Sequence, residues 1–599
     1  MKKFPTSKLA IFILFALVGF LLYFPSLKGE FIFDDYGNIA LNPVITNLNE
    51  SFSKIFQTRG LVRLSFALNY HFFRLNPFSY HIINVAIHVF SSFLVYLFLL
   101  LTLQTPFFKK KRMAAKPQIL ALLASLFFLV HPLQSQAVAY LTQRYESTCA
   151  LFYLLTLVLY LQARLSPKKK RQVVFIILSV ISGLLASSSK EIALTLPLAV
   201  LLLELTFFNQ IRKAVRFLLP YLLIWIKIGF FYFYSLMMVN KLNPQGFLQA
   251  TTALHGKIEI TRFNYLLTQI NVIPLYLRLV FLPWGQRVDW DFSLTKNFFQ
   301  WPTPFSGTLL LTIIILAGFL WWKKYRLASF GIFFFFLNLL ISSSLIPIAD
   351  LVFEHRVYLS MAGTSFFLAE LISLIWPRIN RKILTGSLLI ILIILSGLTL
   401  KRAWLWGNKF YLWQDNYQKS PDKARVNKNF GAELTKTGEV KTGLSLLRKA
   451  VEIDPDQVEY QNALAVTLDE NGYLQEAEKE YQQSLKINDQ AKDIFFLLGN
   501  LQVRLEKPEE AVDNFEKALI LDPNYEPAYT GLCSAYGKLK QFDLAIYNCQ
   551  KSLVIDPNLG APHYNLYVLY TVLGNQEKAR YHQEKARTGK KTFRQKTYY

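Results

Sequence analysis

The sequence changes character near residue 400, and this break constrains the fold more than any other feature. Before it lie about ten strongly apolar runs, most of them long enough for a helix that crosses a bilayer. After it the chain is mostly polar and follows a regular period. Hydrophobic residues make up 53% of the chain, which suits a bilayer better than a soluble core. We therefore predict an all-α protein in which a polytopic membrane domain precedes a second helical domain.

The basic residues between the apolar runs predict how the chain crosses the membrane. We expect spans at residues 9–27, 79–103, 118–132, 147–163, 172–187, 192–208, 217–239, 307–322, 327–346, 357–376 and 383–400. Basic tracts typical of cytoplasmic loops occur at Lys109–Arg112, Lys168–Arg171, Arg212–Lys213, Lys323–Lys324 and Arg381–Lys382. They explain much of the net charge of +26 without a nucleic-acid partner. The N-terminus is then cytoplasmic, and because the number of spans is odd, the second domain lies outside the cytoplasm, on a bacterial inner membrane.

Residues 264–284 are apolar but are not expected to cross. Their polar or helix-breaking residues are Asn264, Gln269, Asn271, Pro274 and Arg278. A crossing here would also move the later basic tracts outside the cytoplasm. We expect instead a helix that lies at the outer surface or re-enters it. Lys401 and Arg402, at the outer end of the last span, oppose this topology, but five basic tracts outweigh two charges.

The second domain repeats with a period of 34 residues. The pairs Asp454-Pro455, Asp522-Pro523 and Asp556-Pro557 fall on this grid, and Asn488-Asp489 fills the missing place. The period is typical of tetratricopeptide repeats, which are helical hairpins that stack into a solenoid. The expected repeats cover residues 424–457, 458–491, 492–525 and 526–559, with a truncated fifth repeat to about residue 587.

These patterns divide the chain into three parts. Residues 1–403 form the membrane domain, and residues 404–587 form the solenoid, with a connecting helix over 404–420. Residues 588–599 form a basic disordered tail. A solenoid of this type suits the binding of an acceptor peptide, and a plain assembly scaffold is the open alternative.

Cys533 and Cys549 fall on the two facing helices of one expected repeat. We expect them to be neighbours, with Cα atoms within roughly 7 Å if a bridge is to form. Simple packing is the first interpretation, because a free buried cysteine behaves as a small hydrophobe. A disulfide is the alternative, since a location outside the cytoplasm permits one.

Charged residues gather in the loops that this topology places outside. Asp34 and Asp35 directly follow the first span, and two adjacent carboxylates can act as a general base or bind a divalent cation. The other charges at this level are Arg59, Arg63, Arg144, Glu146, Lys190, Glu191, Glu354 and Arg356. A charge at the membrane rim is costly unless it is paired or functional. Solvated rim residues are the plain alternative for any one of them, but acid and base occur together in every loop.

The second expected span carries a polar stripe. His81, Asn84 and His88 recur at spacings that place them on one face of a helix. The stripe is either part of a substrate site or a hydrogen-bonded seam between helices. Asp289-Trp290-Asp291 resembles the Asp-x-Asp metal site of nucleotide-sugar enzymes, but such donors are cytoplasmic and this segment is expected outside.

Taken in order, these motifs resemble one known family. Phe33-Asp34-Asp35, Arg63, Leu75-Asn76-Pro77 and the stripe of the second span are similar to the opening of the transmembrane and tetratricopeptide-repeat O-mannosyltransferases and their bacterial relatives. The likeness continues through His131-Pro132, Ala137-Val138, Arg144, Leu151-Phe152, Ser189-Lys190-Glu191, Pro197, Pro283-Trp284, Asp289-Trp290 and Glu354 to Ser360. It covers essentially the whole chain.

The resemblance implies the C-type glycosyltransferase fold and transfer of a mannose-like hexose from a polyprenyl-phosphate donor to protein Ser or Thr outside the cytoplasm. Asp34 or Asp35 fits the base, and a guanidinium fits the departing phosphate. The predicted donor and substrate contacts are Arg63, His81, Asn84, His88, Arg144, Lys190, Glu191, Glu354 and Arg356. No metal centre is implied, although a divalent cation at the two aspartates remains open. The apolar runs beside these residues would hold the polyprenyl tail, and membrane lipid is a further expected partner.

Three positions depart from the family pattern. Gln136 stands where animal members tend to have an acid, Glu146 stands where they have Asp, and His355 separates Glu354 from Arg356. Two other functions also remain open. One is a non-enzymatic scaffold that recruits partners through its repeats, which would have no need for the acid–base groups. The other is the same fold acting on a glycolipid, which would have little use for a peptide-binding solenoid.

Overall fold

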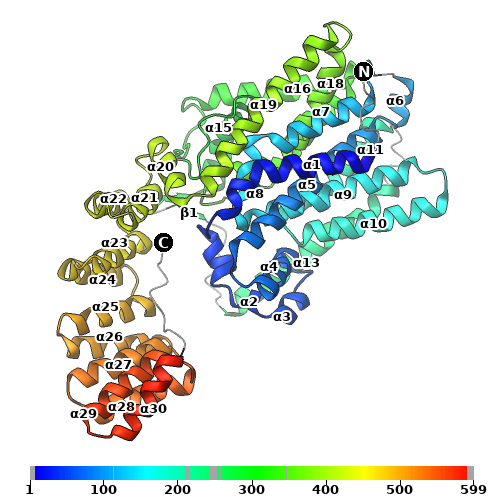
Figure 1. The fold of residues 1–599 in the computed structure, drawn as a ribbon. Coiled ribbons are helices and arrows are strands. Elements are labelled where there is room, and N and C mark those ends of the chain that lie inside the picture. Colours follow the sequence, from blue (N-terminus) through cyan, green and yellow to red (C-terminus); the bar gives the residue numbers. More distant parts are fainter. Residues whose placement is uncertain are drawn as a thin grey trace. The chain divides into compact units, whose positions relative to one another are not determined.

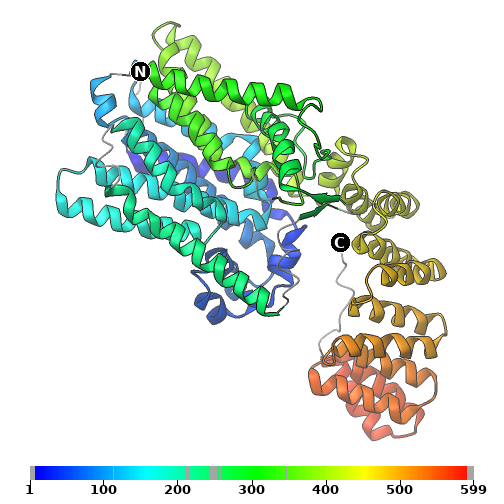
Figure 2. The same ribbon diagram turned by 180° about the vertical axis from the view of Figure 1, so that it is seen from behind.

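The computed structural model describes residues 7–111, 113–208, 216–242, 253–255, 258–343 and 347–589. The chain is helical almost throughout and forms two compact units, Met1–Asp415 and Asn416–Tyr599 (Figures 1 and 2). A short antiparallel hairpin, β1 (Ala253–His255) with β2 (Ile258–Ile260), interrupts the first unit. The predicted disordered tail lies almost wholly outside the described residues.

The longer helices of the first unit are α1 (Lys8–Tyr23), α4 (Gly60–Phe73), α5 (Pro77–Thr102), α7 (Pro117–Val130), α9 (Arg144–Leu165), α10 (Lys169–Ser187), α11 (Leu196–Phe207), α13 (Leu222–Leu242), α15 (Arg262–Phe281), α16 (Thr303–Trp322), α17 (Arg326–Leu339), α18 (Ser360–Ile375) and α19 (Arg381–Trp406). The short ones are η1 (Phe24–Lys28), η2 (Tyr36–Ala40), α2 (Pro43–Thr46), α3 (Leu48–Ser53), α6 (Pro106–Lys110), η3 (Pro132–Gln134), α8 (Ser135–Ala139), η4 (Leu141–Gln143), η5 (Glu191–Thr195), η6 (Leu219–Tyr221) and η7 (Glu354–Val357). Helix α20 (Lys409–Lys419) leads into the second unit.

Among the described residues, seven helical segments are long and apolar enough to cross a membrane: Lys8–Lys28, Pro77–Thr102, Leu141–Leu165, Lys169–Ser187, Arg216–Phe233, Thr303–Trp322 and Arg381–Trp406. Helices α7 and α8 would form an eighth span with a bend of 50°. The prediction of about eleven spans is too high by this measure. The remaining expected spans coincide with α11, α17 and α18, of which the longest has 16 residues. At 1.5 Å per residue it covers about 24 Å, less than the ~30 Å hydrocarbon core.

Helix α15 covers the segment that the sequence predicts not to cross, and it is not among the seven candidates. The membrane orientation stays a prediction that rests on the basic tracts.

The bend after α7 has a local cause in the sequence. Pro132 has no N–H with which to continue a helix, and His131 before it is extended, with φ −74° and ψ 127°. His131 Nδ1 accepts a hydrogen bond from the Leu133 N–H, and Nε2 donates to the carbonyl of Val280 at 2.9 Å. The chain therefore turns within the helical bundle and carries residues 131–144 across it.

The centre of the first unit is packed by helices distant in sequence. Helix α5 lies against α1, α7 and α9, while α18 lies against α17 and α7 (Figure 1). Phe98 of α5 stacks on Phe366 of α18 with ring centroids 4.6 Å apart. Gly331 and Gly363 let α17 and α18 meet backbone to backbone, because a Cβ on either would lie 2.4 Å from the carbonyl oxygen of the other.

The second unit is a stack of helical hairpins, visible in Figure 1 as successive pairs from α21 to α30. Its helices are α21 (Ala424–Lys436), α22 (Val440–Ile453), α23 (Val458–Glu470), α24 (Leu474–Ile487), α25 (Lys492–Arg504), α26 (Pro508–Leu521), α27 (Glu526–Lys538), α28 (Phe542–Ile555), α29 (Gly560–Val572) and α30 (Gln576–Thr588). The small residues Ala477, Ala511 and Ala545 are fully buried where the paired helices approach.

Cys533 of α27 and Cys549 of α28 form a disulfide, with Cα atoms 5.2 Å apart. The expectation that they are neighbours is confirmed. The preference for simple packing of two thiols is wrong, because the paired helices bring the two side chains into bonding geometry rather than mere contact. The third cysteine, Cys149 of α9, is free and buried.

The disulfide offers a test of the predicted orientation. Disulfides persist outside the cytoplasm and are reduced inside it. If the repeats lie outside, thiol alkylation of the denatured protein from intact cells should label Cys149 alone, and prior reduction should raise the label to all three cysteines. Mass spectrometry of the labelled peptides provides the measurement. Full labelling without reduction would place the repeats in the cytoplasm.

Candidate active site

The loop after α1 is held against the loop before α9 by Asp35. This side chain is fully buried. Its Oδ1 accepts hydrogen bonds from the N–H and the hydroxyl of Thr142, at 2.7 and 2.5 Å, and its Oδ2 accepts from the N–H of Ile32 at 3.1 Å. Both carboxylate oxygens are therefore engaged. Asp35 joins two loops that are over a hundred residues apart in the chain.

Asp34 is exposed beside this anchor. Its N–H donates to the phenol oxygen of Tyr140 at 3.1 Å. Burial, and then the carboxylates of Asp35 and Asp34, raise the pKa of Tyr140 well above its usual 10, so both carboxylates act on this phenol. Phe33 has a left-handed backbone, with φ 47°, which is rare for a bulky residue and occurs at constrained functional loops.

Burial raises the pKa of Asp35 from 3.8 to about 7, although the hydrogen bonds from Thr142 and Ile32 act in the opposite direction. The folded protein therefore holds this proton more tightly than the unfolded chain does. The contribution of Asp35 to stability is complete below about pH 4 and is lost as the pH rises toward 7.

We accordingly expect the stability of the purified protein to fall between pH 5 and 7 by up to about 1.4 kcal/mol per pH unit, and this component to disappear in Asp35→Asn, which cannot ionise. Unfolding temperatures in detergent across this range would measure it. Asp34→Asn is the matched control and should keep the slope of the parent. Equal slopes for the parent and Asp35→Asn would contradict the assignment.

Arg144 is fully buried at the start of α9, two residues after Thr142. Its guanidinium donates from Nε to Asn84 Oδ1 and from Nη1 to Asn69 Oδ1, each at 2.7 Å, and from Nη2 to the carbonyl of Tyr80 at 2.8 Å. It also lies over the ring of Phe66, 4.6 Å from the centroid. All three nitrogens are thus held by neutral acceptors of α4 and α5, and Arg144 joins these helices to α9.

The polar stripe on α5 makes hydrogen bonds to other segments, as a seam would, and its place in a substrate site stays a prediction. Asn84 Nδ2 donates to the carbonyls of Val138 and Leu141. His88 Nδ1 accepts from the Tyr358 hydroxyl at 2.8 Å, and its Nε2 donates to the carbonyl of Leu129 at 3.0 Å. His81 Nε2 lies 3.2 Å from the carbonyl of Gly29. These contacts hold the loops of residues 29–35 and 131–144 against α5.

Lys190, directly before η5, and Glu191, its first residue, form ion pairs with neighbouring side chains. Lys190 Nζ lies 2.6 Å from Oε2 of the buried Glu146 on α9. Glu191 Oε1 lies 3.3 Å from Nε of Arg59, and both of these side chains are over a third exposed. Arg63 on α4 is half-buried and has no ion pair within the described part of the chain.

A second polar group surrounds Glu354 in η7. This carboxylate is fully buried and accepts from Gln286 Nε2 at 2.8 Å, from the N–H of Arg287 at 2.7 Å and from Trp290 Nε1 at 3.3 Å. Burial raises its pKa, while the charge of Arg402 acts in the opposite direction. The segment with the Asp-x-Asp pattern thus folds over Glu354 through Trp290.

The residues that follow Glu354 also form hydrogen bonds within the protein. Gln136 Oε1 accepts from the N–H of His355 at 2.8 Å. Arg356 donates from Nη1 to the carbonyl of Leu351 at 3.1 Å and from Nη2 to that of Asp350 at 2.6 Å. The position that departs from the family pattern, Gln136, therefore holds η7 against α8.

The site falls into two polar groups on neighbouring loops. One contains Asp34, Asp35, Thr142 and Tyr140, and the other contains Glu354, Gln286 and Arg402. Asp35 makes no ion pair with any of the predicted arginines among the described residues. In that same part of the chain, no three His, Cys, Asp or Glu side chains are grouped so as to hold a metal ion. A cation at the two aspartates stays a prediction.

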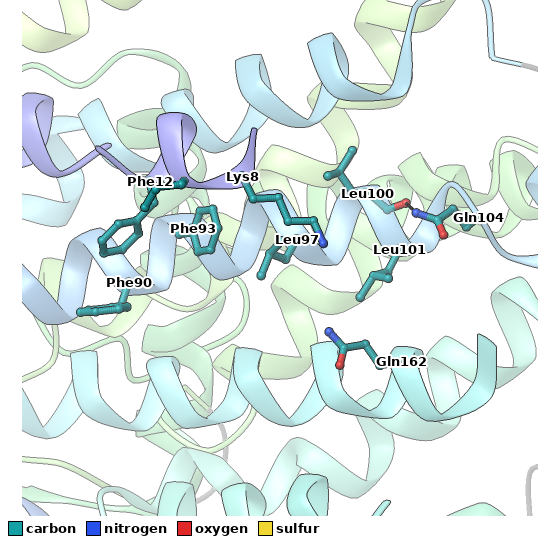
Figure 3. A pocket seen from close by; sticks show the side chains of 10 residues that line it. Lys8, Phe12, Phe90, Phe93, Leu97, Leu100, Leu101, Gln104 and Gln162 are labelled. Atoms are coloured by element: carbon teal, nitrogen blue, oxygen red, sulfur yellow. Dashed lines mark hydrogen bonds between the residues drawn. The ribbon is translucent and has the colours of Figure 1, made fainter. Parts of the chain in front are cut away.

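A separate groove of about 460 Å³ lies between α1, α5 and α9. Figure 3 shows Phe12, Phe90 and Phe93 together at one end, Lys8 near the middle and Gln104 at the other end. Lys8 begins α1, whereas Asp34 follows the end of the same helix, so the groove lies at the opposite end of the membrane helices from the two aspartates. Its apolar walls suit a lipid chain, and none of the predicted site residues lines it.

The repeats of the second unit match a known family. The tetratricopeptide repeat family matches residues 458–490 and 493–525. Solved structures similar to part of this chain include MamA, which is 20% identical with a TM-score of 0.26 and covers 28% of this chain and 91% of that one. YrrB, described as a TPR protein with an unusual peptide-binding site, is 23% identical with a TM-score of 0.25 and covers 29% of this chain and 90% of its own.

Most of the chain is similar to protein O-mannosyl-transferases of animals. Protein O-mannosyl-transferase F38B6.6 of Caenorhabditis elegans is 24% identical over 454 residues, which are 72% of this chain and 61% of the worm protein. Mouse protein O-mannosyl-transferase TMTC3 is 22% identical over 628 residues, 86% of this chain and 64% of the mouse protein. This chain is a distant homologue of the TMTC protein O-mannosyl-transferases. It spans about three fifths of the length of these relatives.

Sequence reasoning does not assign Thr142, Tyr140 or Arg402 to the site. Thr142 and Tyr140 carry no sequence signal, because a hydroxyl near a loop is common. Arg402 does carry one: it is a charge at the outer end of the last apolar run, where cytoplasmic-type charges are not expected. The prediction from sequence counts Arg402 against the topology and does not assign it to the site.

Proposed function

We propose that this chain is a membrane glycosyltransferase that moves a mannose-like hexose from a polyprenyl-phosphate carrier to Ser or Thr of proteins outside the cytoplasm. The observation that carries the proposal is the pair of carboxylates after α1, of which Asp34 is exposed while Asp35 is buried and anchored to Thr142. Distant homology to the O-mannosyl-transferases supports a sugar-transfer reaction. A scaffold would gain nothing from a buried carboxylate, which costs free energy to ionise.

The two aspartates take different roles in this proposal. Asp34 is the catalytic base: it accepts the proton of the Ser or Thr hydroxyl while the hydroxyl oxygen bonds to the anomeric carbon. The bond from that carbon to the phosphate oxygen breaks, and polyprenyl phosphate leaves with the electron pair. Asp35 is a positioning residue, because both of its oxygens are engaged with Thr142 and Ile32. It fixes the direction of the Asp34 side chain.

The arginines divide in the same way. Arg144 and Arg356 donate hydrogen bonds to Asn84, Asn69 and backbone carbonyls. We therefore propose that they hold the loops in place. Arg63 is half-buried without an acid partner among the described residues and stays a candidate for contact with the donor. Lys190 and Glu146 form a pair that tethers η5 to α9.

The acceptor is proposed to be a protein segment presented by the tetratricopeptide repeats, on the side of the membrane where lipid-linked sugars are used. The glycolipid alternative differs in the acceptor alone, and the scaffold alternative predicts no transfer at all. One assay therefore separates the three.

The test uses the purified full-length protein in lipid nanodiscs with polyprenyl-phosphate mannose and a pool of Ser- and Thr-containing peptides. Hexose addition to peptide, read by mass spectrometry, is the expected result. GDP-mannose replaces the lipid donor in a control reaction and should give no product. Hexose found only in the lipid extract would favour the glycolipid enzyme. Absence of transfer to both acceptors, with a correctly folded parent, would contradict the proposal.

A further inference from the structure

Arg402 is buried near the outer end of α19, with 7% of its side chain exposed. Its Nε, Nη1 and Nη2 atoms have no hydrogen-bond partner among the described residues. This contrasts with Arg144, which is also buried and uses all three nitrogens. A buried guanidinium without hydrogen bonds is costly, so its retention calls for a ligand that supplies acceptors.

The two nearest carboxylates do not fill this role. Glu354 Oε2 lies 4.0 Å from Nη2, and Asp415 Oδ2 lies 3.7 Å from Nη1, which are ion-pair separations but exceed hydrogen-bond length. Glu354 already accepts three hydrogen bonds from Gln286, Arg287 and Trp290. The carboxylates therefore moderate the charge of Arg402 and leave its N–H groups available.

Three further buried donors lie in the elements that pack around Arg402. The indole N–H groups of Trp406 and Trp413 and the side-chain amide of Gln134 have no hydrogen-bond partner among the described residues. Trp406 lies one helical turn after Arg402 on α19, and α19 packs against η3, which carries Gln134. Several N–H groups without acceptors thus gather in one region of the first unit.

Aromatic contacts join this region to the aspartates. The ring of Trp406 stacks on Tyr140 with centroids 5.7 Å apart, and the hydroxyl of Tyr140 accepts from the N–H of Asp34. Phe33, directly before Asp34, packs on Trp413 at 4.8 Å. The unpartnered donors are therefore one aromatic layer away from the base that we assign.

We propose that Arg402, together with the indole N–H of Trp406, binds the phosphodiester of the lipid-linked sugar donor. This rests on the proposed function. A phosphodiester has two non-bridging oxygens that share one negative charge, and the guanidinium fork matches them with two parallel N–H groups. When the sugar leaves, the phosphate gains a further charge, which the same fork stabilises. Arg402 is then a catalytic residue that contacts the leaving group.

The experiment measures binding of undecaprenyl phosphate and of undecaprenol to the purified full-length protein by native mass spectrometry. The alcohol has the same tail and lacks the phosphate. We expect the parent to prefer the phosphate, and Arg402→Gln to bind it roughly tenfold to a hundredfold more weakly with no change for the alcohol. Trp406→Phe keeps the ring that stacks on Tyr140 and should lose a smaller, few-fold part of the preference. Arg381→Gln, an exposed arginine at the other end of α19, is the matched control.

Stability without ligand separates this role from a structural one. Removal of a buried guanidinium that makes no hydrogen bonds among the described residues should leave the unfolding temperature of Arg402→Gln unchanged or higher. A lower unfolding temperature together with an unchanged preference for the phosphate would show that Arg402 is only an ion-pair partner of Glu354, and would overturn the inference. If Arg402→Gln keeps the preference for the phosphate and still transfers sugar, the inference about Arg402 is overturned while the proposed function stands. Phosphate-selective binding through Arg402 in a parent that transfers no sugar would contradict the proposed function alone.

Discussion

Replacing Asp34 with asparagine is expected to lower the rate of sugar transfer by about two to four orders of magnitude, the usual contribution of a general base. The substitution keeps the shape of the side chain and removes its ability to accept a proton. Asp34 is exposed and its N–H, which donates to Tyr140, is kept in the variant, so the fold should be little affected. The rate of peptide mannosylation, with the unfolding temperature of each variant beside it, is the measurement.

Asp35→Asn is the informative comparison. In this variant the amide nitrogen would face either the N–H of Ile32 or the donors of Thr142. The substitution should therefore lower both the stability at low pH and the activity. If Asp34→Asn transfers sugar at the rate of the parent while Asp35→Asn is folded and inactive, the roles of the two carboxylates are reversed. If both variants are active, neither is the base.

The second large effect concerns stability. Arg144→Met should destabilise the membrane unit by roughly 3–5 kcal/mol, since it breaks a buried hydrogen-bonded network and leaves Asn84, Asn69 and the carbonyl of Tyr80 without donors. The measurement is the shift in thermal unfolding in detergent, followed by tryptophan fluorescence. Arg402→Met serves as the matched control, a buried arginine without hydrogen bonds in the described residues, and should show no such loss.

A small effect of Arg144→Met on unfolding, together with a large loss of donor binding, would return Arg144 to its first predicted role at the phosphate. Arg144→Lys sharpens the distinction. It keeps the charge but cannot reach Asn84, Asn69 and Tyr80 with one fixed fork, so it should recover little of the stability.

Much of the architecture could be predicted from the sequence, because apolar length and a 34-residue period report directly on local structure. The span count is where this reasoning fails. An apolar run is equally compatible with a long helix and with a short helix followed by a loop that enters the bundle. Pro132 after α7 marks one such break, whereas nothing in the composition of residues 327–346 shows that α17 ends at Leu339.

For the candidate site, the sequence identifies polar residues in an apolar background but not their partners. His88 and Asn84 are conspicuous in α5, yet they hold Tyr358, Val138 and Leu141 in the structure. Arg144 is conspicuous as a charge, yet its neutral acceptors come from α4 and α5, far from it in the chain. Pairing between distant segments depends on tertiary contacts, and a single sequence carries no record of them.

The seam along α5 also has a consequence for how the first unit responds to substitution. Asn84 donates to the carbonyls of Val138 and Leu141, and His88 contacts Leu129 and Tyr358. One helix therefore holds segments that are far apart in the sequence. A substitution in this seam acts on all of these segments together, whereas a substitution in one loop acts on that loop alone.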